Sequence, residues 1–151
     1  LKDPHCGAFA VIRLCTYFLA YFCVAFCIRF SPRVGLCWTL ALVLERGLSG
    51  LAVAAFPMAK NTGLAHTFAT AADRESVQKI LIVLSVLLAA ALIALGGGAL
   101  VAAALLVLWR YHHVAVKEFG GITGDLAGWF LQKAEFWMLA ALAASQWGGI
   151  L

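Results

Sequence analysis

Charged side chains are scarce in this sequence. Only 12% of its 151 residues are Asp, Glu, Lys or Arg, whereas 64% are hydrophobic, and the mean hydropathy is +0.97. Soluble domains rarely have such a composition, which is typical of a chain whose solvent is lipid. The net charge of +4 is small and scattered, which argues against a protein that binds nucleic acid.

Closely spaced metal-binding cysteines are also missing. None of the five cysteines has a neighbouring Cys or His at the spacing of a zinc site, so we expect all of them to pack as small apolar residues: Cys6, Cys15, Cys23, Cys27 and Cys37. The start of the chain at Leu1 lacks a signal-peptide pattern and resembles the interior of a longer protein. No repeat or linker is visible, so residues 1–151 are expected to form a single membrane domain.

Long apolar runs, by contrast, recur along the chain. About twenty residues are needed to cross the hydrocarbon core, and a spanning segment must satisfy its own backbone, which favours helices. The sequence therefore predicts an all-α, polytopic transmembrane helix bundle with about five membrane spans, at residues 8–28, 35–56, 77–95, 99–116 and 122–145.

The distribution of Lys and Arg predicts the orientation of these spans. Most basic residues fall on one side, which should be cytoplasmic by the positive-inside rule: Lys2, Lys60, Arg74, Lys79, Arg110 and Lys117. Only Arg29 and Arg33 belong to the other side. Three polar segments, at residues 1–5, 60–76 and 120–125, should therefore converge on the cytoplasmic face.

The stretch Gly120-Gly121-Ile122-Thr123-Gly124-Asp125 is the most informative of the three. Its glycines would let the backbone approach a ligand closely, and amides at the start of the following helix would favour an anion such as phosphate. Asp125 could hold a metal or accept a proton. An ordinary loop, with Thr123 and Asp125 capping a helix, explains the same residues equally well.

Several charges fall inside the predicted spans. Glu45 and Arg46 lie midway along the second span, and such residues usually face other helices and often mark function. Because neighbours in sequence point in different directions on a helix, we expect each to find a partner on another helix, with Arg46 pointing into the bundle. A structural ion pair between helices, for example Arg13 with Glu45 or Glu135, is the alternative.

The polar groups expected on the cytoplasmic face form a coherent set: Asp3, Arg46, Lys60 and Asp125 with the glycine-rich backbone. Carboxylates hold Mg²⁺, and Arg and Lys bind phosphate. The residues alone therefore indicate a membrane enzyme or carrier that handles an anionic, phosphorylated ligand.

Three stretches resemble the cobalamin synthase family, whose members are adenosylcobinamide-GDP ribazoletransferases. Residues 120–128 resemble the family's G-G-x-T-G-D-x-x-G, residues 1–7 resemble M-K-D-S/P-R-x-G, and residues 57–64 resemble P-x-A-R-x-x-G-L. His5 and Lys60 stand where the family usually has Arg.

The family's acidic motif, D-G-x-A-D-x-x-D-G, is not in this chain. By the resemblance, it would precede the stretch at residues 1–7, and the main metal carboxylates are therefore expected upstream of Leu1. The chain resembles the C-terminal portion of such an enzyme and is expected to be inactive alone.

The resemblance implies a Mg²⁺-dependent transferase of phosphorus-containing groups in the bacterial inner membrane, with its active face cytoplasmic. It would join α-ribazole, or its 5′-phosphate, to adenosylcobinamide-GDP and release GMP, with a homo-oligomer also compatible. The implied catalytic and metal-binding residues are Asp3 and Asp125, and the implied phosphate-binding residues are Arg46, Lys60, Gly120, Gly121, Thr123 and Gly124.

Three other classes of membrane protein remain open. A small transporter or transport subunit would use the charges inside the spans as a substrate path. An enzyme like the CDP-alcohol phosphotransferases would perform related chemistry on lipids, although that family's aspartate-rich signature is not seen. A structural membrane subunit would perform no chemistry.

Overall fold

Five α-helices make up the described part of the chain. The computed structural model describes residues 7–59 and 74–151, and no β-strand occurs within these ranges. Each helix matches one predicted span to within a few residues at either end: α1 (Ala8–Phe26), α2 (Pro32–Ala55), α4 (Arg74–Ala94), α5 (Gly98–Phe119) and α6 (Gly124–Trp147). The predicted all-α bundle is confirmed.

Local sequence explains where these helices start and stop. Ser31 caps α2 by accepting a hydrogen bond from the amide of Val34, and Pro32 follows at the first helical position, where its missing N–H is harmless. The tight return between α4 and α5 uses Gly96, which has a φ of 87°. These signals allow consecutive helices to alternate in direction.

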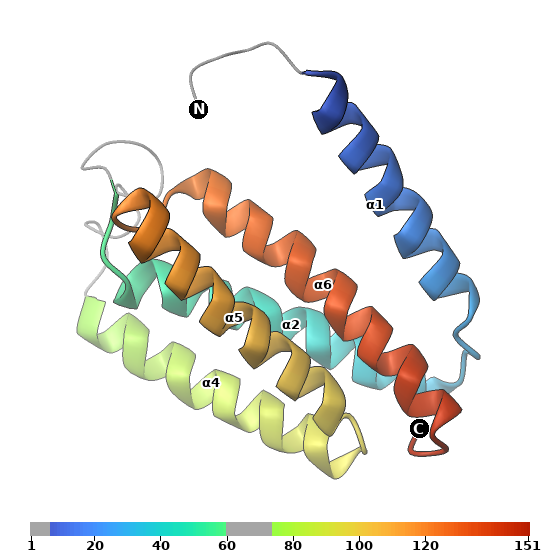
Figure 1. Cartoon of the computed structure of the whole chain (residues 1–151). Helices are drawn as coiled ribbons and strands as arrows, with labels where there is room; N and C mark the ends of the chain where they lie inside the picture. The colour runs from blue at the N-terminus through green and yellow to red at the C-terminus, as the bar shows by residue number, and fades with distance from the viewer. Residues whose placement is uncertain (1–6, 60–73) are drawn as a thin grey trace.

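Helices α2, α4, α5 and α6 pack around one apolar core (Figure 1). The large, fully buried side chains come from all four helices: Leu44, Leu92, Leu100, Tyr111, Phe130, Met138 and Leu142. Because the helices alternate in direction, the bundle has two ends. We call them the Gly121 end, with Ala55, Arg74, Phe119 and Gly124, and the Gly96 end, with Pro32, Ala94, Gly98 and Trp147.

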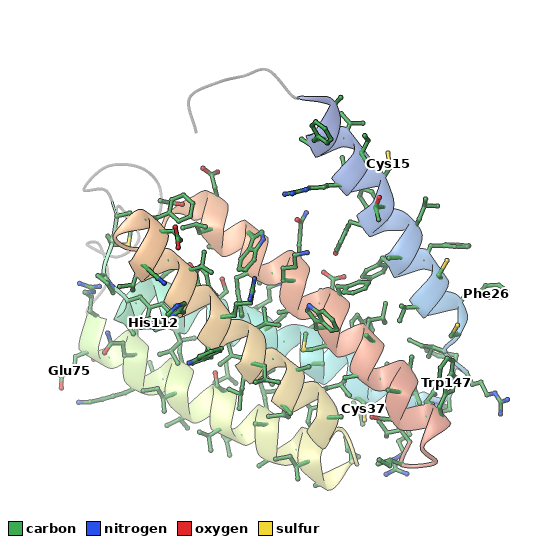
Figure 2. The ribbon with its side chains drawn as sticks, viewed as in Figure 1. Cys15, Phe26, Cys37, Glu75, His112 and Trp147 are labelled. Carbon is green, nitrogen blue, oxygen red and sulfur yellow. The ribbon has the colours of Figure 1, made fainter. Side chains whose placement is uncertain are left out.

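Helix α1 lies outside this four-helix core (Figure 1). It has no buried residue and touches α6, where the Tyr17 ring lies 6.0 Å from that of Phe136. Figure 2 shows Cys15 and Phe26 on this helix, clear of the bundle core. The prediction that all the cysteines pack is therefore wrong for the three on or next to α1: Cys15, Cys23 and Cys27 are exposed, and only Cys37 of the described cysteines is buried.

Four of the five helices, α1, α2, α4 and α5, are long and apolar enough to cross a membrane. Helix α6 has 24 residues but does not join them, because Gln132, Lys133 and Glu135 make its central turns more polar than theirs. Large apolar side chains are exposed around the bundle, as expected for a surface in contact with lipid. The chain thus has the features of a multi-pass membrane protein.

Candidate functional site

The connection between α5 and α6 forms a tight turn at the Gly121 end. Helix α5 finishes at Gly120 in the left-handed conformation (φ 69°), and the amides of Gly120 and Gly121 donate to the carbonyls of Val116 and Ala115. Thr123 then caps α6 by accepting a hydrogen bond of 3.3 Å from the amide of Leu126. Both ends of the turn are therefore fixed by local hydrogen bonds.

This turn pairs with the segment that follows α2. The amide of Ile122 donates to the carbonyl of Pro57 (2.8 Å), and the amide of Ala59 donates to the carbonyl of Ile122 (3.0 Å), which makes a single parallel bridge between Met58 and Ile122. The side chain of Ile122 is buried. The stretch at 57–64 and the stretch at 120–128 are thus in direct contact at their first residues.

Gly121 allows that contact. A Cβ atom on Gly121 would lie 2.6 Å from backbone atoms of Pro57, Met58 and Ala59, and its φ is 151°. No other residue fits at this point without moving the backbone. The structural role of Gly121 is therefore close packing of one loop against another, whatever it binds.

The polar groups of the turn face outward at this end of the bundle. Gly120, Gly124 and Asp125 are exposed and Thr123 is half-buried. Asp125 lies in the first turn of α6, and it makes no hydrogen bond or ion pair with any other described residue. A ligand that approaches this end would meet a carboxylate that no described residue pairs, beside the positive end of a helix dipole.

Several predicted parts of the site lie outside the described residues. Asp3 belongs to the first six residues, and Lys60 follows Ala59 directly in the sequence. The main metal carboxylates, expected upstream of Leu1, also lie outside them. The roles of these groups therefore stay predictions.

The predicted convergence of the three polar segments stays a prediction, because residues 1–5 and 60–73 lie outside the described residues. The structure shows that Pro57–Ala59, just before the second segment, pairs with Ile122 of the third. Basic residues of α4 and α5 lie toward the same end, as the orientation argument expects, whereas Arg29 and Arg33 lie at the Gly96 end.

Arg46 does not point into the bundle, and that prediction is wrong. Its side chain is 60% exposed, whereas the Glu45 side chain is fully buried, and Arg46 Nε lies 3.4 Å from Glu45 Oε1. The long Arg side chain bends back to the residue beside it, although neighbours in sequence point in different directions on a helix. Arg46 also lies nine residues before the end of α2, or about 13 Å along the helix from the turn.

Glu45 belongs instead to a polar cluster where α1, α2 and α6 approach each other. Neither of its carboxylate oxygens has a hydrogen-bond partner among the described residues, and its charge interacts with that of Glu135 on α6. Glu135 accepts a hydrogen bond of 2.8 Å from the hydroxyl of Tyr21, so the ion pair between Arg13 and Glu135 suggested by the sequence is replaced by a tyrosine contact.

Sequence reasoning missed Tyr21. The signal that would have found it is the i, i+4 pair Tyr17 and Tyr21 on α1, since their hydroxyls bond to Gln132 and Glu135 on one face of α6.

The metal-binding capacity of the described residues is limited. Within residues 7–59 and 74–151, no group of three or more His, Cys, Asp or Glu side chains could hold a metal ion. In sites for phosphoryl transfer, however, Mg²⁺ is often held by one or two carboxylates together with substrate phosphates. Asp125 fits such a shared site, and within residues 7–59 and 74–151 no second and third protein ligand join it.

Comparisons with known proteins identify the family of this chain. A family model for cobalamin-5-phosphate synthase matches residues 1–143. The chain belongs to the cobalamin-5-phosphate synthase family. An adenosylcobinamide-GDP ribazoletransferase of Lachnoclostridium phytofermentans is 38% identical over 146 residues, which cover 95% of this chain and 54% of that protein. The chain thus spans about half the length of this relative. No solved structure matches this chain.

Membership of the cobalamin-5-phosphate synthase family confirms the resemblance seen in the sequence. The match includes all three motif stretches, and the structure places residues 57–59 of one against Ile122 of another. The Gly121 end is therefore the candidate active site.

Proposed function

We propose that the protein that carries this chain is an adenosylcobinamide-GDP ribazoletransferase of a bacterial inner membrane, with the Gly121 end as its cytoplasmic active face. It would join α-ribazole, or α-ribazole 5′-phosphate, to adenosylcobinamide-GDP. The observation that supports this most is the backbone pairing of Ile122 with Pro57 and Ala59, because it brings two motif stretches that are far apart in the sequence to one end of the bundle.

The reaction is a transfer at phosphorus. A ribose hydroxyl of the ribazole attacks the phosphorus that carries cobinamide, the bond from this phosphorus to the oxygen of GMP breaks, and the hydroxyl proton is lost. Such a transfer requires positioning of the reactants and neutralisation of phosphate charge, more than covalent help from the protein.

The turn residues would bind the diphosphate. Thr123 and Gly124 lie at the N-terminus of α6, where backbone amides at the surface favour an anion. Gly120 and Gly121 would shape the turn around the ligand and not donate to it, because their amides already donate to the carbonyls of Val116 and Ala115. Lys60, which follows the paired segment in sequence, would add a positive charge. Arg46 remains a predicted phosphate ligand, although its depth and its pairing with Glu45 separate it from the turn.

Asp125 and Asp3 would hold Mg²⁺. A carboxylate next to a phosphate cradle repels the ligand unless a cation lies between them, which supports Asp125 as a metal ligand shared with the diphosphate. The bound metal would stabilise negative charge on the departing GMP.

A product assay tests the proposal. Membranes from a bacterium that lacks its own ribazoletransferase and expresses the protein are given adenosylcobinamide-GDP, α-ribazole and Mg²⁺. We expect cobalamin and GMP in equal amounts, and no product when Mg²⁺ is chelated. Uptake of either substrate into vesicles without a chemical product would contradict the proposal and favour a transporter.

A further inference from the structure

A groove of about 540 Å³ runs along the outer surface of the bundle between α5 and α6. Leu106 and Val107 of α5 and Trp137 of α6 form much of its apolar wall. Leu106 and Trp137 are exposed, so the groove faces the surroundings of the bundle and not its core. Its volume is in the range of sites for small molecules, about 300 to 1,000 Å³.

Two cations from different helices line the same groove. Arg110 is nine residues from the end of α5 at Phe119, and Lys133 is nine residues from the start of α6 at Gly124. Both Cα atoms therefore lie about 13 Å below the Gly121 end, at the same depth. Neither side chain makes a hydrogen bond or ion pair with another residue of the described ranges.

An anion bound between Arg110 and Lys133 would stabilise both cations. A basic residue inside a membrane segment is costly unless it is paired, and two like charges across one groove also repel each other. Their flexible stems can carry the charged groups toward the headgroup region while the stems stay in apolar surroundings. An anion between Arg110 and Lys133 would remove both costs.

The position of the apolar wall indicates what kind of molecule carries the anion. Leu106, Val107 and Trp137 lie on the Gly96 side of the two cations, deeper in the helices, whereas Trp129 lies on the Gly121 side, where interfacial Trp is common. A ligand with its charge at the cations must therefore have an apolar body that extends toward the middle of the membrane. A nucleotide would leave its polar atoms unpaired along that wall.

We propose that this groove binds one anionic phospholipid, with its phosphate between Arg110 and Lys133 and an acyl chain along Leu106, Val107 and Trp137. This proposal does not depend on the proposed transferase activity, because it concerns a different surface and its test needs no catalysis.

Quenching by brominated lipids tests it. In the protein with every tryptophan except Trp129 and Trp137 replaced by Phe, Trp38, Trp109 and Trp147 included, the emission comes from two residues that line the groove. In phosphatidylcholine nanodiscs, brominated phosphatidylglycerol should quench this emission at a concentration at least about fivefold lower than brominated phosphatidylcholine, because each basic residue attracts anionic lipid.

Matched variants make the test specific. The double variant Arg110→Gln/Lys133→Gln should quench equally with both lipids, and Arg110→Lys/Lys133→Arg, which keeps both charges, should retain the preference. Arg13→Gln/Lys79→Gln removes the same charge elsewhere and should also retain it. Equal quenching by both lipids before any change at the cations, a preference that survives in the Gln double variant, or displacement of the brominated lipid by GMP would overturn the proposal.

Discussion

The two ends of the bundle use similar residues in different ways. At the Gly96 end, two arginines bond to the protein itself, Arg33 through its side chain and Arg29 through its backbone. The guanidinium of Arg33 donates two hydrogen bonds, of 3.0 and 2.7 Å, to the carbonyl of Leu95, and the backbone of Arg29 exchanges hydrogen bonds with the side-chain amide of Gln146. Charged and polar side chains here form hydrogen bonds with backbone groups near the helix ends.

At the Gly121 end, uncharged groups cap the backbone carbonyls at the helix ends. The side-chain amide of Gln78 donates to the carbonyl of Ala54 at the end of α2, and the amides of Gly120 and Gly121 cap α5. Asp125 is thereby left without a described partner. Figure 2 shows Glu75 toward this end and Trp147 toward the other. The two ends thus differ in how they use charge: the Arg33 guanidinium caps a helix at the Gly96 end, whereas at the Gly121 end Glu75 pairs with Lys79 and Asp125 has no partner among the described residues.

The largest expected effect is that of Gly121→Ala. Its Cβ would meet three backbone atoms at 2.6 Å, so the turn and the segment after α2 must separate. We expect a loss of about 3 kcal/mol in the free energy of unfolding and loss of product formation, from strain and overpacking together. Gly120→Ala is the control, because nothing lies within 4 Å of its Cβ and only the left-handed φ costs energy. Reversible unfolding in detergent would measure both, and equal losses would refute the role of close packing.

A smaller effect is expected at the Gly96 end from Arg33→Met. The substitution keeps the apolar stem and removes both hydrogen bonds to Leu95. It should lower the free energy of unfolding by about 2 kcal/mol, as for other hydrogen bonds to charged groups, and leave ribazole transfer unchanged. A fall in transferase activity without a fall in stability would show that the Gly96 end also takes part in the reaction.

The two helix caps offer a matched pair of still smaller effects. Ser31 caps α2 at the Gly96 end and Thr123 caps α6 at the Gly121 end, through hydrogen bonds of 3.2 and 3.3 Å. Alanine at either position should cost about 1 kcal/mol of stability. Only Thr123→Ala should also reduce activity, because Thr123 belongs to the proposed phosphate cradle. Identical activities for the two variants would limit Thr123 to capping.

The smallest effect is expected from Lys79→Gln. Lys79 and Glu75 form an exposed pair at 2.8 Å, one turn apart on α4. Pairs of this kind contribute about 0.3 to 0.5 kcal/mol, so melting temperature and activity should both stay near those of the unmodified protein. A large change in either would mean that this surface of α4 takes part in function.

Hydropathy predicted the helices well because each span must bury its own backbone hydrogen bonds within one continuous segment. The predicted second span, residues 35–56, and α2 at Pro32–Ala55 differ by three residues at one end and one at the other. The motif at 120–128 also predicted a cap, and Thr123 serves as one.

Other features depend on tertiary packing and could not be predicted from hydropathy or from the motifs. Hydropathy does not tell which of two adjacent charges is buried, and it is Glu45, not Arg46, that faces the core. It likewise gives no sign that α1, although apolar, lies outside the four-helix core, or that Ile122 pairs with Pro57 and Ala59.

Asp125→Asn decides whether the Gly121 end is the active site. Glu75→Gln is its matched control, since both carboxylates are exposed in the first turn of a helix at this end. With equal amounts of folded protein in the membrane, Asp125→Asn should reduce cobalamin formation at least about 100-fold, the scale expected when charge stabilisation at a reacting centre is lost, and Glu75→Gln should not. Full activity of Asp125→Asn would show that the Gly121 end is not where the reaction takes place.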